Sequence, residues 1–323
     1  MNTKKVRLGI VGYGNIGKAC EKIALADNEI ELIGIFSRRK DVKSPLNTPV
    51  YAQENIFDFD LDVALLCVGS QSDLEETAYK IARKFNTVDS FDTHARMSIY
   101  ADRLSKIAKD NDRLCYIGIG WDPGIFSLAR ALFCAVMPMA ETQTFWGKGV
   151  SQGHSEAIRR IDGVKYAKQY TIPKESALKT AREGKGENLS ARDKHLRECF
   201  VVACDGADRA EIEKTIVNMP YYFADYDTVV HFVDEKYFFD RCGDSEHGGF
   251  VFASGDFDGF ESKGELSLKM ADNPIFTAGV LVAYAKANAK EYERGERGVK
   301  SILDVPISFV LSGDWIDKIK RFV

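Results

Sequence analysis

The sequence lacks several features that would place it in a particular class of protein. No apolar run approaches the ~20 residues that a membrane-spanning helix requires. The N-terminus has neither the long apolar core nor the small-residue cleavage site of a signal peptide. No internal repeat or low-complexity tract is present. We therefore expect a globular, cytoplasmic protein.

Basic charge is not in excess, and motifs for metal binding and covalent catalysis are missing. The chain has 44 Lys and Arg against 48 Asp and Glu, a net charge of −4, which argues against nucleic acid as its main partner. Seven cysteines form no CxxC pair or zinc spacing, and five histidines form no HxH or HExxH pattern. We therefore expect reduced thiols and no metal site. A G-x-S-x-G elbow is also absent.

With 323 residues, the chain is long enough for two domains, each with its own core. In the first part, strand-like and helix-like segments alternate, which is typical of βαβ units and a doubly wound parallel sheet. The predicted strands are Lys5 to Val11, Ile30 to Phe36, Val63 to Val68, Thr87 to Phe91 and Leu114 to Ile119. The predicted helices are Asn15 to Ala26, Asp73 to Phe85 (with Ser72 as the N-cap of a capping box) and Arg96 to Lys109. The fold class is therefore α/β, with a Rossmann-type sheet.

The pattern changes after Gly120, which predicts a second, α+β domain on an antiparallel or mixed sheet. Up to about Met270 we expect short strands and few clear helices, apart from an apolar helix over Ile125 to Met137. The polar stretch Thr180 to Arg197 is predicted to be a surface loop or helix pair. A long helix over Phe276 to Tyr292 then returns the chain to the first domain. The expected division is 1–120 plus about 275–323 for the first domain, and about 121–274 for the second.

A glycine-rich turn connects the first strand and the first helix. It fits G-x-G-x-x-G, and its residues are Gly12, Tyr13, Gly14, Asn15, Ile16 and Gly17. In this context Gly12 permits the tight turn, Gly14 lets a pyrophosphate approach the backbone, and Gly17 lets helix and strand pack closely. The helix N-terminus then attracts the anion. A plain strand-to-helix turn is the alternative, but the strand–helix–strand context favours a dinucleotide site.

The end of the second strand indicates which dinucleotide binds. An NAD enzyme usually carries an acid about 20 residues after the turn, whereas this chain has Ser37, Arg38 and Arg39 there. Guanidinium groups pair with phosphate oxygens, so this run favours the 2′-phosphate of NADP over a solvated basic turn. The predicted cofactor contacts also include the end of the third strand, at Cys67, Val68, Gly69 and Ser70.

Two acids follow neighbouring strands, where ligands of doubly wound sheets bind. Asp92 follows the fourth strand, and Asp122 follows the fifth in the run Trp121-Asp122-Pro123-Gly124. Asp is common in turns for its own local hydrogen bonds, so either one alone carries little weight. Two at neighbouring strand ends favour a cation-binding or acid/base role.

The second domain contains further polar candidates whose spacing alone does not prove that they converge. A single histidine is more often structural, and a single arginine more often a surface ion pair. These candidates are Trp146, Gln152, Gly153, Thr171, Arg197, His247 and Asn273.

Several particular runs together resemble the meso-diaminopimelate dehydrogenase family over nearly the full chain. The glycine turn is shared by many families, but the runs Gly120-Trp121-Asp122-Pro123-Gly124 and Phe145-Trp146-Gly147 are far more specific. Further matching runs are Ser151-Gln152-Gly153-His154-Ser155, Gln169-Tyr170-Thr171, His247-Gly248-Gly249 and Asp272-Asn273-Pro274.

The resemblance implies a reaction, a cofactor and an assignment of residues. Members deaminate the D-centre of meso-2,6-diaminopimelate reversibly with NADP, giving L-2-amino-6-oxopimelate and ammonia in lysine and cell-wall precursor synthesis, and a homodimer forms through the second domain. The residues implied at the reacting end are Asp92, Trp121, Asp122, Trp146, Gln152 and Gly153. Those implied at the distal L-amino acid end are Thr171, Arg197, His247 and Asn273. Asp92, Asp122 and Trp146 would take part in catalysis, the acids by holding the ammonium and Trp146 by shielding the site.

Two other functions remain open from the sequence. One is another amino-acid oxidoreductase, similar to dihydrodipicolinate reductase or saccharopine dehydrogenase, against which the Trp-Asp-Pro-Gly run argues. The other is a non-catalytic NADPH sensor, which would keep the glycine turn but need not keep the acids and the Arg, His and Asn residues.

Overall fold

The computed structural model describes residues 4–69, 73–243 and 247–323. The chain divides into two compact units, unit 1 with Met1–Leu128 and Pro274–Val323, and unit 2 with Ala129–Asn273. Among the described residues, no helix combines the length and apolar character needed to cross a membrane.

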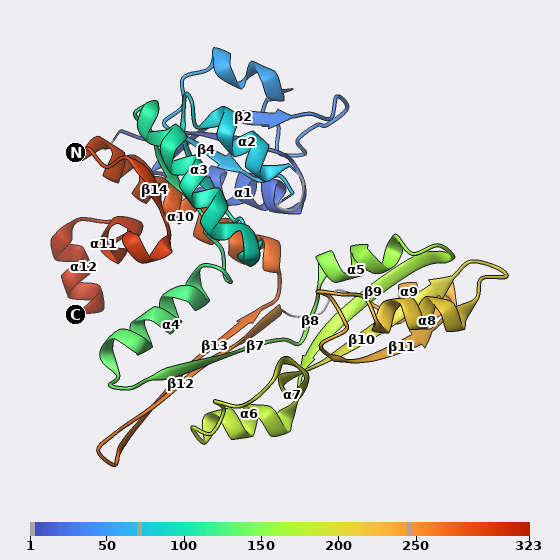
Figure 1. The fold of residues 1–323 in the computed structure, drawn as a ribbon. Helices are drawn as coiled ribbons and strands as arrows, with labels where there is room; N and C mark the ends of the chain where they lie inside the picture. Colours follow the sequence, from blue (N-terminus) through green and yellow to red (C-terminus); the bar gives the residue numbers. More distant parts are fainter. Residues whose placement is uncertain (1–3, 70–72, 244–246) are drawn as a thin grey trace. The chain divides into compact units, whose positions relative to one another are not determined.

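Unit 1 is built on a seven-stranded sheet in the order β14-β6-β5-β4-β1-β2-β3, with every neighbouring pair parallel (Figure 1). The strands are β1 (Val6–Val11), β2 (Ile30–Ser37), β3 (Val50–Ala52), β4 (Val63–Leu66), β5 (Asn86–Asp89), β6 (Leu114–Tyr116) and β14 (Gly298–Lys300). The helices are α1 (Asn15–Ala26), α2 (Leu74–Ile81), α3 (Met97–Asp110), α10 (Asn273–Glu293), α11 (Ile307–Val310) and α12 (Trp315–Phe322), and α4 (Ile125–Val136) continues into unit 2. This arrangement confirms the predicted Rossmann-type sheet.

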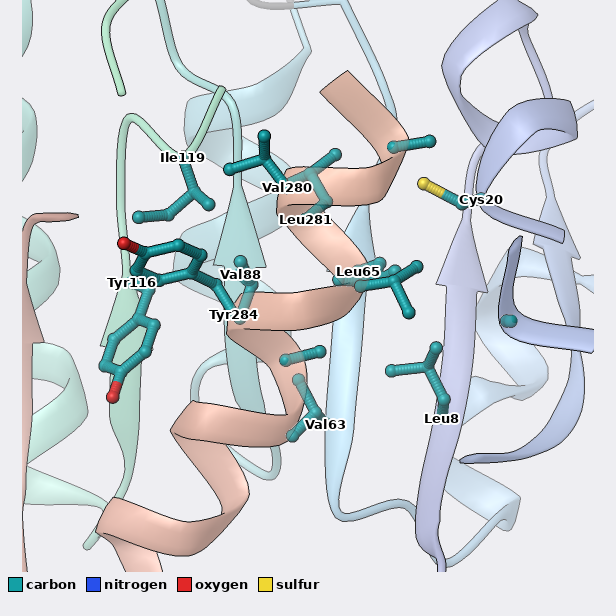
Figure 2. Packing of buried hydrophobic residues seen from close by; sticks show 14 of the residues in the cluster. Leu8, Cys20, Val63, Leu65, Val88, Tyr116, Ile119, Val280, Leu281 and Tyr284 are labelled. Carbon is teal, nitrogen blue, oxygen red and sulfur yellow. The ribbon is translucent and has the colours of Figure 1, made fainter. Parts of the chain in front are cut away.

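Side chains of the central strands alternate between two cores, as the period of a β-strand requires. Leu8, Val63 and Leu65 lie on one face with residues of α1 and α10, and Figure 2 shows Val280, Leu281 and Tyr284 of α10 packed there. Val11, Ala64 and Leu66 lie on the opposite face with residues of α2 and α3. Burial on both faces explains why these strands are nearly continuous apolar runs in the sequence.

Three strands end earlier than predicted, and the first of them is β4, which ends at Leu66 rather than Val68. β5 ends at Asp89 rather than Phe91, and β6 ends at Tyr116 rather than Ile119. Beyond these points the backbone N–H groups bond outside the ladder, since Phe91 N donates to the Asp89 side chain and Ile119 N donates to the Asp89 carbonyl. Helix α2 is also shorter than predicted, and its predicted N-cap, Ser72, lies outside the described residues.

A buried lysine connects the chain end to the rest of unit 1. Lys286 Nζ donates hydrogen bonds to Asp27 Oδ2 (2.7 Å), Glu29 Oε2 (2.9 Å) and Ser312 Oγ (3.0 Å). Burial alone would raise the pKa of Glu29, but the hydrogen bonds from Ser312 and Lys286 outweigh it and lower the pKa to about 2. These bonds join α10, the segment before β2 and the C-terminal tail.

Unit 2 contains two sheets, one of four strands in the order β11-β10-β9-β8 and one of three in the order β13-β12-β7. The first is mixed, since β10 pairs with β9 antiparallel and with β11 parallel, and the second is antiparallel. The strands are β7 (Glu141–Trp146), β8 (Gly149–Val150), β9 (Val164–Pro173), β10 (His195–Ala203), β11 (Asp227–Phe232), β12 (His247–Phe257) and β13 (Phe260–Met270). The helices are α5 (Gln152–Arg159), α6 (Glu175–Arg182), α7 (Ala191–Lys194), α8 (Arg209–Val217) and α9 (Glu235–Arg241).

The prediction of short strands with few helices in this region was wrong. β9, β10, β12 and β13 have 10, 9, 11 and 11 residues, and Figure 1 shows the last two as one long hairpin. Helices α5 and α8 contribute Ile158 and Ile212 to one core of the four-stranded sheet, and α9 contributes Phe238 to another. Both faces of this sheet are thus covered, which obscures the apolar–polar alternation that would have revealed long strands.

Candidate active site

The glycine turn has the conformation and the free space that its motif predicts. Gly12 has φ +91°, and a Cβ there would lie 2.7 Å from the Cys67 carbonyl oxygen. A Cβ on Gly17 would lie 2.3 Å from the Gly12 carbonyl oxygen, so both positions require glycine. A Cβ on Gly14 would meet no atom within 4 Å, and α1 begins at the next residue, Asn15. Open space at Gly14 beside a helix N-terminus fits a pyrophosphate group.

The basic run after β2 is held against this turn. Arg39 Nη2 donates to the Tyr13 carbonyl oxygen (2.5 Å), and Arg39 N donates to Ser37 Oγ (3.1 Å). Arg38 forms an exposed ion pair with Asp73 (2.6 Å), which is weak enough for the guanidinium to exchange partners. The Tyr13 ring is buried and its hydroxyl bonds to Glu21, so Tyr13 offers the turn only its backbone.

The predicted cofactor residues after β4 also line the turn. The Cys67 carbonyl and the Val68 side chain lie against Gly12, and the Gly69 carbonyl accepts from Asp73 N (3.1 Å). The fourth residue of this group, Ser70, lies outside the described residues.

The two predicted acids of unit 1 follow neighbouring strands of the sheet, β5 and β6. Asp92 is exposed, and its carbonyl accepts from His94 N (3.0 Å). Asp122 is half-buried and follows Trp121, whose ring packs edge-on against Phe126 at 5.3 Å between centroids. Parallel strands end at the same edge of a sheet, so both acids belong to the edge where ligands of such folds bind.

In unit 2, the structure corrects the prediction for Arg197. The stretch predicted to be a surface loop or helix pair contains the end of α6 and all of α7, but Arg197 lies beyond them on β10. It has 5% of its surface exposed and stands opposite Thr171 of β9 in the strand register. Its guanidinium donates to Thr171 Oγ1 and stacks over the Tyr226 ring at 4.0 Å. The alternation of His195 and Arg197 along the strand turns both side chains to the same face.

The buried guanidinium is not neutralised by the protein. Arg197 forms no ion pair with a carboxylate in the described part of the chain, and its Nε has no hydrogen-bond partner there. Burial lowers the pKa of Arg197, and Gln169 Oε1 close to it is also without a partner among those residues. A buried, unpaired cation beside unsatisfied polar groups is unfavourable unless a bound ligand supplies the missing charge and hydrogen-bond partners.

His247 is connected to the same sheet. Its Nε2 bonds to the Val150 carbonyl (2.9 Å), and β8 pairs Gly149 with Thr171. Gln152 and Gly153 begin α5, whose N-cap is Ser151, and Gly153 is exposed.

Trp146 is held by a residue that the sequence did not single out. His195 is 1% exposed, its Nε2 accepts a hydrogen bond from Trp146 N (3.0 Å), and its ring stacks on the indole at 5.5 Å. Burial, Arg197 and Lys194 together lower the pKa of His195 to about 3, so the ring is neutral and its proton lies on Nδ1. Trp146, Thr171, Arg197 and His247 are thereby brought together around β8, β9 and β10.

Asn273, the last predicted residue, is the first residue of α10 and the last residue of unit 2. Sequence reasoning missed His195, Gln169 and Tyr226 as neighbours of Arg197. Two of them could have been found from the sequence, because Gln169 and His195 each lie two residues before a predicted site residue on the same strand. Among the described residues, no group of three His, Cys, Asp or Glu side chains is arranged to hold a metal ion.

Comparison with known proteins agrees with this geometry and confirms the resemblance. Residues 120–272 match the model of the diaminopimelic acid dehydrogenase C-terminal domain. The meso-diaminopimelate D-dehydrogenase of Ureibacillus thermosphaericus is 46% identical over 311 residues, which cover 95% of each chain.

Two solved structures are also similar. The dehydrogenase of C. glutamicum in complex with DAP has a TM-score of 0.94 at 39% identity, covering 99% of this chain and 100% of that one. An engineered D-amino acid dehydrogenase bound to NADP+ has a TM-score of 0.89 at 38% identity, with the same coverage. The chain therefore belongs to the meso-diaminopimelate D-dehydrogenase family.

Proposed function

We propose that this protein catalyses the NADP-dependent, reversible oxidative deamination of the D-centre of meso-2,6-diaminopimelate to L-2-amino-6-oxopimelate and ammonia, in lysine and cell-wall precursor synthesis. The observation that carries the proposal within the chain is Arg197, a buried guanidinium without a carboxylate partner in the described residues. A substrate with two carboxylates supplies the missing partner. The solved relative with DAP bound supports this choice of substrate.

Arg197 is proposed to bind the carboxylate of the distal L-amino acid end. Thr171 lies on the adjoining strand β9, His247 bonds to the Val150 carbonyl of β8 in the same sheet, and Asn273 completes the set. A guanidinium fork binds a carboxylate through two parallel hydrogen bonds, which fixes orientation as well as charge. An LL or DD isomer would leave some of these buried groups unpaired, which accounts for selectivity.

Asp92 and Asp122 are proposed to hold the reacting ammonium group and to help remove its proton, with Trp121, Gln152 and Gly153 as further contacts of this end. Trp146 is proposed to exclude water and align the reacting carbon, and the bond from Trp146 N to His195 supports a fixed indole. The chemistry that a bound cofactor would supply is acceptance of the hydride from that carbon. Addition of water to the resulting imine then releases ammonia.

Unit 1 is proposed to bind the dinucleotide, and unit 2 to bind substrate and form the dimer. The open space at Gly14 supports a pyrophosphate there, and Cys67, Val68, Gly69 and Ser70 would line the site. Ser37, Arg38 and Arg39 are proposed to bind the 2′-phosphate. The NADP+ complex of the engineered relative supports this cofactor.

Ser37→Asp is expected to lower the ratio of kcat/KM with NADP to kcat/KM with NAD by about 100-fold, because an acid at this point binds a ribose 2′-hydroxyl and repels a 2′-phosphate. Steady-state rates with both cofactors measure the ratio. Ser98→Asp adds the same charge at an exposed serine of α3 and should leave the ratio unchanged. An unchanged ratio in Ser37→Asp would contradict the assignment.

The proposed reaction is tested with purified protein and each diaminopimelate stereoisomer, following nicotinamide reduction with NADP. Turnover of the meso isomer, with little turnover of the LL isomer, is expected. Turnover of other amino acids, but of no diaminopimelate isomer, would favour a different oxidoreductase. Tight NADPH binding without turnover of any amino acid would favour a sensor.

A cytoplasmic homodimer is also proposed, formed through unit 2. The seven cysteines, none of them in a disulfide, suit a reducing compartment. At the turn of the β12–β13 hairpin, Phe257 and Phe260 are 61% and 77% exposed, which supplies apolar surface for a second copy. Light scattering of the wild type and of a Phe257→Ser/Phe260→Ser variant tests the dimer, which the double substitution should weaken.

A further inference from the structure

A fully buried carboxylate joins the two loops of unit 1 that carry the proposed catalytic acids. Asp89, the last residue of β5, is 0% exposed. Its Oδ1 accepts hydrogen bonds from Phe91 N (2.9 Å) and Gly118 N (3.3 Å). Its Oδ2 accepts one from the Tyr100 hydroxyl (2.6 Å), and its backbone carbonyl accepts one from Ile119 N (2.8 Å).

These bonds lie at the point where each loop leaves the sheet. Phe91 directly precedes Asp92, and Gly118 and Ile119 precede the run Gly120-Trp121-Asp122. Both loops have left their strands there, and a backbone hydrogen bond from Ile119 N to the Asp89 carbonyl links them. The Asp89 side chain adds a further link between the loops, because its Oδ1 accepts hydrogen bonds from both Phe91 N and Gly118 N.

The surroundings of Asp89 argue against a role in stability alone. Asp89 forms no ion pair with a lysine, arginine or histidine of the described residues. Burial raises the pKa of Asp89 to about 6, despite the hydrogen bonds from Tyr100, Phe91 and Gly118. Tyr100, Phe91 and Cys115 around it are themselves fully buried. A charged group is unfavourable in such a place, so the carboxylate is retained for the bonds that it makes to Phe91 N, Gly118 N and the Tyr100 hydroxyl.

We propose that Asp89 is a positioning residue for the reaction, holding the Asp92 loop and the Trp121–Asp122 loop in one fixed arrangement without touching substrate. The proposal rests on the proposed function, since it takes Asp92 and Asp122 as the groups that hold the reacting ammonium. Misplacing such groups by about 1 Å costs on the order of 100-fold in rate.

The test compares two side chains with the same branching as aspartate. In Asp89→Asn, the amide oxygen still accepts from Phe91 N and Gly118 N, and the amide N–H group donates to the Tyr100 hydroxyl. Asp89→Leu removes all three side-chain bonds. We expect the leucine variant to lose about 100-fold in kcat with meso-diaminopimelate, and the asparagine variant to stay within about 5-fold of wild type. The Kd for NADPH should stay within about 3-fold in both, because the glycine turn keeps its own contacts.

Activity is expressed per NADPH-binding molecule, so that partial unfolding does not imitate loss of positioning. A leucine variant that keeps kcat within about 3-fold would overturn the proposal, as would an asparagine variant that falls as far as leucine. If the leucine variant does not fold, Asp89→Ser replaces it, and its kcat is judged by the same thresholds. The shorter serine side chain cannot bond to both loops. Failure of the proposed function is distinct, because the wild-type protein itself would then turn over no diaminopimelate isomer.

Discussion

Replacing Arg197 with methionine is expected to lower kcat/KM for meso-diaminopimelate by about 1000-fold, while the Kd for NADPH stays within about 2-fold. Methionine keeps an unbranched apolar stem but removes the charge and the guanidinium donors that are proposed to bind the substrate carboxylate. Truncating one partner of a buried, hydrogen-bonded charge pair typically costs 2–5 kcal/mol, and 1000-fold corresponds to about 4 kcal/mol. Steady-state kinetics and NADPH titration measure the two effects separately.

The stability of this variant is informative as well. In the free protein the guanidinium is buried, bonded to Thr171 and stacked on Tyr226, without a carboxylate partner in the described residues. Removing an uncompensated buried charge should leave the unfolding temperature unchanged or raised, even though activity is lost.

Arg192→Met is the matched control for Arg197→Met, since Arg192 is half-exposed and forms a surface ion pair with Asp227 (2.8 Å) in the same unit. Arg192→Met should change neither the activation free energy derived from kcat/KM nor the free energy of unfolding by more than about 0.5 kcal/mol. Equal losses of substrate turnover and NADPH binding in Arg197→Met would contradict a substrate-binding role.

The dinucleotide turn was predictable because its requirements are local. Gly12 has a positive φ of +91°, and Gly17 faces the carbonyl of Gly12 in the same turn, and the motif states those constraints directly. The apolar runs of β1 and β4 were predictable for a similar reason, since a strand buried on both faces is apolar throughout. The short strands β3 and β14 were not predicted, because three residues carry no period.

The location of Arg197 on a buried strand could not be predicted from local sequence patterns. Its segment is polar, with Arg192, Asp193 and Lys194 in succession, and polar runs normally indicate loops. The strand begins at the next residue, His195, and is specified by pairing with β9, more than twenty residues earlier in the chain. Which polar residues of separate strands converge is a property of register, and a single sequence does not contain it.

Asp89 and His195 were missed for another physical reason. Each acts by accepting a hydrogen bond from a backbone N–H group, at Phe91 and Gly118 for Asp89 and at Trp146 for His195. Every residue except proline has such a donor, so the sequence does not reveal which N–H group is the partner. The acids and aromatics that are proposed to contact substrate have recognisable chemistry, whereas the residues that orient them are recognisable only by geometry.

The burial of Asp89 also has a consequence for stability that the Asp89→Asn variant isolates. Burial raises the pKa of this carboxyl from 3.8 to about 6 in the folded protein. Between these two values the folded state therefore binds more protons than the unfolded state does. The contribution of Asp89 to the free energy of unfolding must then decrease as pH rises through this window, and must stay constant above it.

A shift of this size corresponds to roughly 3 kcal/mol, of which about 2 kcal/mol falls between about pH 4.5 and about pH 8. Asparagine does not titrate, so the variant should gain that amount of stability relative to wild type across this range. Unfolding midpoints of both proteins, measured at several pH values without cofactor, give the difference directly. Parallel curves would mean that Asp89 titrates alike in both states, whereas a gain toward low pH would mean that folding favours its charged form. The expected divergence toward high pH would show that the fold tolerates an ionised carboxylate that burial disfavours, as a residue retained for loop geometry should.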